Sequence, residues 1–105
     1  NMSSKKEQAF GPTWGKGQTI ASAVTTANVV IDASGKQENL VVTNKDASIL
    51  VYVATGSSSV TASTADYLVL PGTQVTMSKN LDHTHFATIS ASGTPSIHVI
   101  PGRGL

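Results

Sequence analysis

Short apolar runs recur along most of the chain, separated by turns rich in Ser, Gly, Asn, Asp and Pro. From residue 19 onward the runs follow one another every eight to twelve residues or so, the spacing typical of a β-sandwich or β-barrel. The pattern predicts strands over 20–24, 29–31, 39–44, 49–54, 60–62, 67–70, 73–78, 86–91 and 97–100. No long helical period appears, so we expect an all-β fold of about eight short strands.

The links between these runs are too short for parallel crossovers, which favours antiparallel pairing. We therefore predict an antiparallel β-sandwich of jelly-roll or related Greek-key type. The run at 49–54, "ILVYVA", is apolar on both faces and predicts a central strand. The predicted core consists of Val30, Leu40, Val42, Leu50, Tyr52, Leu68, Leu70, Val75, Ile89, Ile97 and Val99.

Residues 1–18, "NMSSKKEQAFGPTWGKGQ", break the strand pattern, and we predict an extended N-terminal arm before a sandwich domain at 19–105. A polar tail without a partner seldom carries a tryptophan, yet this segment holds Phe10 and Trp14. One hypothesis is that both rings fill pockets on a partner, because aromatic side chains are favoured interface anchors. The other is that the arm folds back and Trp14 caps its own core. The predicted partner-binding residues are Phe10, Trp14, Lys5, Lys6 and Lys16.

Composition supports the β prediction and excludes several functions. Ser and Thr make up about a quarter of the chain and valine is abundant, which favours turns and strands. The formal net charge of +1 argues against a nucleic-acid binder that works by charge. No apolar run approaches the roughly 18 residues of a membrane span, so we expect no membrane partner. Cysteine is absent, which excludes disulfides and thiolate metal ligands.

Candidate chemistry is sparse. His83 and His85 in "LDHTHF" would share one face of a strand that included both. Two imidazoles are too few for a closed site in one chain, so we predict no metal and no cofactor for the monomer. Three copies around an axis would supply six nitrogens, as in the tips of phage tail spikes. No Gly-x-Ser-x-Gly elbow or paired carboxylates appear, and we predict that the protein is not an enzyme.

The stretch from about 38 to 104 resembles small all-β virion proteins of tailed bacteriophages, most closely head decoration (cement) proteins. The resemblance rests on a succession of strands and turns rather than on a catalytic motif. The matching positions are Thr43-Asn44, Val51-Tyr52-Val53, Gly56-Ser57, Pro71-Gly72, the strand from Ala87 to Gly93, and Pro101-Gly102.

The resemblance implies a structural protein on the exterior of the capsid, which bridges neighbouring major capsid proteins. It also implies a homo-oligomer, for which we favour a trimer over a dimer. The alternative is a tail fibre or spike head module that binds a host glycan, through Tyr67 and the Ser/Thr-rich loops, or a metal on a trimer axis.

Overall fold

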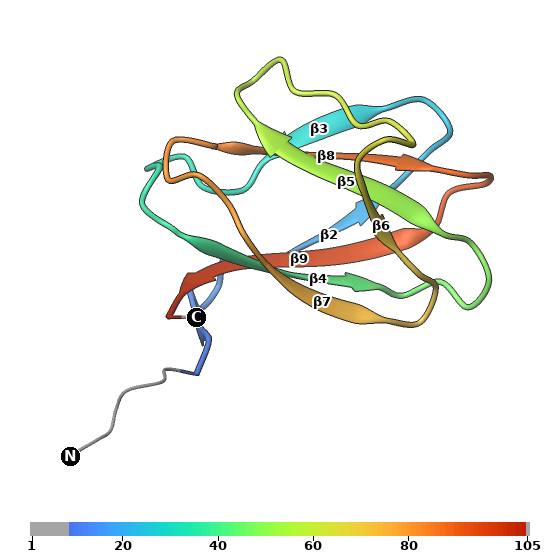
Figure 1. The fold of residues 1–105 in the computed structure, drawn as a ribbon. Coiled ribbons are helices and arrows are strands. Elements are labelled where there is room, and N and C mark those ends of the chain that lie inside the picture. The colour runs from blue at the N-terminus through green and yellow to red at the C-terminus, as the bar shows by residue number, and fades with distance from the viewer. Residues whose placement is uncertain (1–8, 105) are drawn as a thin grey trace.

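The structure, a computed structural model, describes residues 9–104, and within them it is all-β with no helix. No segment of this part of the chain forms a long apolar helix of the kind that crosses a membrane. Two antiparallel sheets lie one above the other in a sandwich-like arrangement (Figure 1). The strands are β1 (Gly11–Pro12), β2 (Gln18–Ala21), β3 (Ala27–Val30), β4 (Asn39–Asn44), β5 (Val51–Gly56), β6 (Tyr67–Val69), β7 (Gln74–Ser78), β8 (His85–Ser90) and β9 (Ser96–Arg103).

The larger sheet, called sheet A here, has the order β1-β9-β4-β7, and β2 pairs with β9 beyond β1 along the same edge. The smaller one, sheet B, has the order β3-β8-β5-β6. Early and late strands therefore pair in a nested way: β2 with β9, β3 with β8, β4 with β7 and β5 with β6. Successive strands along the chain mostly change sheets, which brings distant segments side by side.

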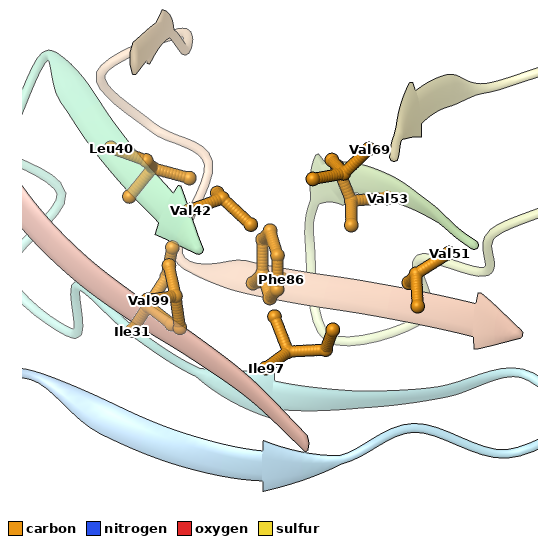
Figure 2. Packing of buried hydrophobic residues seen from close by; sticks show 9 residues of the cluster. All are labelled: Ile31, Leu40, Val42, Val51, Val53, Val69, Phe86, Ile97 and Val99. Carbon is orange, nitrogen blue, oxygen red and sulfur yellow. The ribbon is translucent and has the colours of Figure 1, made fainter. Parts of the chain in front are cut away.

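The core lies between the two sheets, with side chains from both pointing inward (Figure 2). Phe86 of β8 is the largest fully buried side chain and sits near the centre of the cluster. In sheet A four of the five predicted core residues are confirmed: Leu40, Val42, Ile97 and Val99 are completely buried. The fifth, Val75 of β7, is partly buried against the cluster. In β4 and β9 buried and partly buried positions alternate over most of the strand, so each predicted pair falls on one face of the sheet.

In sheet B the predicted core is largely wrong. Val30, Leu68 and Leu70 are 47%, 41% and 52% exposed. Leu50, Tyr52 and Ile89 are only partly buried. The side chains that do point inward are Val51, Val53, Val69 and Phe86. The runs at 49–54 and 67–70 are apolar on both faces, so alternation alone did not identify the inward face.

Eight of the predicted strands are present as β2 to β9, with ends shifted by a few residues. The predicted strand at 60–62 is wrong, because this segment belongs to the loop between β5 and β6. Of the predicted arm, residues 1–8 lie outside the described part of the chain. Within residues 9–18, Gly11 and Pro12 pair with Arg103 and Gly102 of β9, and Gln18 pairs with Val99.

Candidate functional site

The loop between β1 and β2, residues 13–17, presents the chain's one tryptophan to solvent. Trp14 is 83% exposed, the largest value among the large apolar side chains of the described residues. The Lys16 amide donates to the Thr13 carbonyl at 3.2 Å, and Gly15 has a φ of 80°. These are the features of a type II turn with Trp14 at its second position. The Thr13 amide donates to the Pro101 carbonyl at 2.9 Å, which ties the turn to β9.

The other predicted anchor, Phe10, lies against its own chain. Gly102 of β9 has no side chain, and a Cβ there would collide with the Phe10 ring and the Gly11 carbonyl oxygen. Phe10 is half-buried as a result. The structure therefore separates the two aromatic residues: Phe10 helps hold the N-terminal segment on β9, whereas Trp14 is free to contact another molecule.

A cavity of about 400 Å³ lies beside this loop, at the edge where β2 of sheet A faces β3 of sheet B. Thr13, Lys16 and Gln18 line it from the side of β1 and β2, and Val30, Ser34 and Gln37 line it from the side of β3. The Thr13 hydroxyl donates to Gln37 Oε1 at 2.9 Å across one end. The lining is uncharged apart from Lys16 and Asp32. It has room for a small polar ligand or for one side chain of a partner.

Asp32 contributes to the wall of the cavity but is already engaged. Its carboxylate accepts from Lys79 Nζ at 2.9 Å, from the Gln37 amide at 2.8 Å and from the Ser34 hydroxyl at 2.9 Å. Burial by itself raises the pKa of Asp32, but these hydrogen bonds and the nearby ammonium outweigh burial and hold the pKa below its usual value. The ion pair with Lys79 joins the β3–β4 loop to the β7–β8 loop, so its role is structural.

The predicted positively charged partner-binding residues are only partly described. Lys5 and Lys6 lie outside the described residues. Lys16 is exposed, two positions from Trp14, at the rim of the cavity. The turn therefore presents one aromatic ring and one ammonium group together.

The two candidate metal ligands do not share a strand. β8 begins at His85, and His83 lies in the preceding turn. Both ring nitrogens of His83 lie near partners in its own chain, with Nδ1 2.8 Å from Thr55 Oγ1 and Nε2 3.3 Å from Asn80 Nδ2. His85 Nδ1 lies 2.7 Å from the Thr84 hydroxyl. Within residues 9–104 no three His, Cys, Asp or Glu side chains gather where they could hold a metal ion.

The outer face of sheet B carries a feature that sequence reasoning missed. Tyr52 of β5 lies opposite Leu68 on one side and Ile89 on the other. Leu50 comes directly before β5, Leu70 directly after β6 and Ala91 directly after β8, and the Ala91 amide donates to the Leu50 carbonyl at 3.2 Å. Val24, 58% exposed, lies beside them, where the Ser90 amide bonds to the Ala23 carbonyl. We call this surface the outer apolar patch: Val24, Leu50, Tyr52, Leu68, Leu70, Ile89 and Ala91.

The other half of that face is covered by the chain itself. The β5–β6 loop, residues 57–66, lies over β5 and β8 and reaches β3 (Figure 1). Asn28 Nδ2 of β3 donates to the carbonyls of Ser58 and Val60, and the Ala62 amide donates to Thr26 Oγ1 at 2.8 Å. Ala62 and Ala87 are buried as a consequence. The sequence signal for this covered face is a strand that is apolar on both sides. Strands that are covered on both faces lack the alternation of polar and apolar residues.

Comparison with known proteins identifies no relative. No protein-family model matches the sequence, and no curated protein matches it significantly.

Proposed function

We propose that this protein is a structural virion protein of a tailed bacteriophage, a capsid decoration (cement) protein. It would bind the outer capsid surface and stabilise contacts between major capsid proteins, without catalysis. The observation that carries the proposal is Trp14, an 83% exposed ring on a turn that is fixed to β9. The resemblance of residues 38 to 104 to phage virion proteins is the reason for proposing the major capsid protein as the partner.

The strand order supports the finer fold assignment within this proposal. In a jelly roll, a long antiparallel hairpin of eight strands rolls up, so that the first strand pairs with the last and the inner pairs follow. The pairs β2–β9, β3–β8, β4–β7 and β5–β6 have this nested form. We therefore propose a jelly roll, a fold shared by many viral capsid proteins.

The geometry suggests how such a protein would hold a capsid. The turn around Trp14 is held before binding by one hydrogen bond to β9, from the Thr13 amide to the Pro101 carbonyl, and by the bond from the Lys16 amide to the Thr13 carbonyl within the turn. A preorganised aromatic anchor loses little conformational entropy when it is buried. Lys16 adds a charge at the rim of the contact, and the N-terminal residues with Lys5 and Lys6 precede it in the chain. Stabilisation would come from added buried interface, on the order of 1,000 Å² or more.

The test is binding of the purified protein to capsids that lack it. We expect Trp14→Ala to weaken capsid binding by at least tenfold while the unfolding midpoint stays unchanged, because the ring makes almost no contact with its own chain. Tyr67→Ala is the matched control, since Tyr67 is also aromatic and is 54% exposed at the opposite edge of the molecule, on β6. Equal capsid affinity of the Trp14→Ala variant and the wild type would refute the role of Trp14.

A second candidate function is a tail fibre or spike head module. The cavity of about 400 Å³ favours it, because its lining is largely apolar and carries a few hydroxyl and amide groups, a combination found in small-molecule sites. In that case the protein would be found on the tail. An iron site is not part of this candidate, because His83 lies outside β8 and both of its ring nitrogens lie near partners in its own chain.

A further inference from the structure

We propose that the cavity beside the Trp14 turn binds a small organic anion, a carboxylate carried on a compact apolar body. The inference concerns the cavity alone and does not depend on the capsid hypothesis. A protein that takes up such an anion and never touches a capsid would leave it intact. It also names a ligand chemistry other than the host glycan of the tail-module alternative.

The cavity is bounded by two hydrogen bonds that join its opposite walls. Gln18 Nε2 of β2 donates to the Val30 carbonyl of β3, and the Thr13 hydroxyl donates to Gln37 Oε1. Both bonds connect the N-terminal segment of sheet A to the chain around β3, so the fold itself fixes the two walls. The volume of about 400 Å³ lies toward the lower end of the range for small-molecule sites, which suits a compact ligand.

Two side chains on the walls keep hydrogens that a ligand can accept. Because Gln37 Oε1 accepts the Thr13 hydroxyl, Gln37 Nε2 is left to donate, and within the described chain it has no other partner. Lys16 Nζ brings three more hydrogens and has no ion-pair partner among residues 9–104. The hydroxyls of Thr13 and Ser34 already donate, to Gln37 and to Asp32. The two oxygens of a carboxylate match the free donors of Lys16 and Gln37.

The charge of the walls also favours an anion. Asp32 lines the cavity, but its Oδ2 lies 2.9 Å from the buried Lys79 Nζ, so this pair is neutral as a unit. Lys16 therefore leaves the walls with one uncompensated positive charge. A charge beside the low-dielectric wall of a cavity attracts an anion more strongly than it does in bulk water. Because Lys16 is exposed, we expect a moderate gain from its charge.

The apolar part of the lining determines the rest of the ligand. It consists of Val30, Ile31, Ala33 and Pro101, and the Val30 side chain is 47% exposed. Covering such side chains with an apolar group removes them from water, which is favourable. A bare inorganic anion would leave them uncovered, so the expected ligand is an aliphatic or aryl carboxylate.

The experiment is a titration of the purified full chain with phenylacetate and with its neutral counterpart phenylacetamide, followed by amide-detected NMR. With phenylacetate we expect saturable shifts of the amide signals of Thr13, Ser34 and Gln37, which line the cavity. Phenylacetate should bind about tenfold more tightly than phenylacetamide. The two probes share the same ring, so the difference in affinity reports the carboxylate.

Two variants and one control test the assigned side chains. Gln37→Glu keeps an oxygen that accepts from Thr13 but replaces the donating amide with a second oxygen, so phenylacetate binding should be lost while phenylacetamide still binds. Lys16→Gln should weaken phenylacetate binding about tenfold and remove the preference over phenylacetamide. Lys45→Gln is the matched control and should bind both probes as the wild type does, because Lys45 is equally exposed but lies in the turn after β4, away from the cavity.

The readout separates this inference from the proposed function, because binding of the probes is measured without capsids. Loss of capsid affinity in the Trp14→Ala variant therefore neither supports nor contradicts it. Equal affinities for phenylacetate and phenylacetamide, or an unchanged phenylacetate affinity in the Lys16→Gln variant, would overturn the inference. The same holds if phenylacetate produces no saturable shifts up to its solubility limit, or produces them only at residues outside the cavity.

Discussion

Asn44, at the end of β4, shows how one buried polar side chain connects the two sheets. It is completely buried, and its Nδ2 donates to the Ile49 carbonyl at 2.9 Å and to the Val69 carbonyl of β6 at 3.2 Å. Its Oδ1 accepts from the Asp46 amide at 3.0 Å. One side chain therefore fixes the turn after β4 and links sheet A to sheet B. Buried polar groups are tolerated when they are satisfied in this way.

We predict that Asn44→Ala lowers the free energy of unfolding by about 2–3 kcal/mol, because two carbonyls and one amide lose a partner and the bond to Val69 is buried. Urea unfolding measures this value. Asn80→Ala is the control: Asn80 is exposed, and its side-chain nitrogen lies 3.3 Å from His83 Nε2. A loss below about 0.5 kcal/mol for Asn44→Ala would show that water replaces those bonds.

The Asp32–Lys79 pair is the second residue-scale feature with a measurable consequence. The two side chains are almost fully buried, and Lys79 Nζ also donates to the carbonyls of Asn80 and Leu81. Because the pKa of Asp32 is lower in the folded chain than in the unfolded one, the folded state binds fewer protons in acid. Its contribution to stability is complete above the unfolded value of about 4 and is lost as the pH falls through the folded pKa.

We predict that Asp32→Asn destabilises the fold at neutral pH by about 3 kcal/mol, because Lys79 would remain buried without a counter-charge. The same variant should lose less additional stability than the wild type between pH 5 and pH 2, since the titrating group is gone. Denaturant titrations at several pH values give both quantities. Parallel acid dependence in the two proteins would contradict the assignment.

At the scale of elements, the N-terminal segment contains a strand that is too short to be predicted from the sequence pattern. β1 has only two residues, yet it pairs with the end of β9 beside the half-buried Phe10. Gly102 makes this approach possible, because any side chain there would meet Phe10 and Gly11. Glycine often occurs in a strand at the position where another backbone approaches closely.

We predict that Gly102→Ala destabilises the protein by about 1–2 kcal/mol and releases the segment around Gly11 from β9. Hydrogen exchange at the Thr13 amide, which bonds to Pro101, reports on that release. Gly11→Ala is the matched control from the same pair of strands, since a Cβ there lies 3.6 Å from the nearest atom. Unchanged protection of Thr13 in the Gly102→Ala variant would show that Phe10 does not hold β1 in place.

The two sheets also show what sequence pattern does and does not determine. In β4 and β9 the residues predicted on the inward face, Leu40 with Val42 and Ile97 with Val99, occupy every second position and are buried. β5 and β6 are apolar on both faces, and no local rule distinguishes the core from the exposed side. The missing information is tertiary: which residues face Phe86 depends on pairings between strands far apart in sequence. Likewise, the sequence marked Trp14 and Phe10 as anchors but did not show that Phe10 packs on its own chain.

At the scale of the whole molecule, the fold places two candidate surfaces on different sheets. The Trp14 turn extends from the β1–β2 edge of sheet A, and the outer apolar patch lies on sheet B. A partner bound through one surface would leave the other open.

The central claim is that this protein binds the outside of a phage capsid through the Trp14 turn. The most direct measurement is imaging of virions by electron cryomicroscopy, comparing particles that carry the wild-type protein with particles that lack it. The account predicts extra density on the outer surface of the head, at boundaries between capsid subunits, with the β1–β2 loop against the shell. Density on the tail alone, or an unchanged head surface, would contradict it.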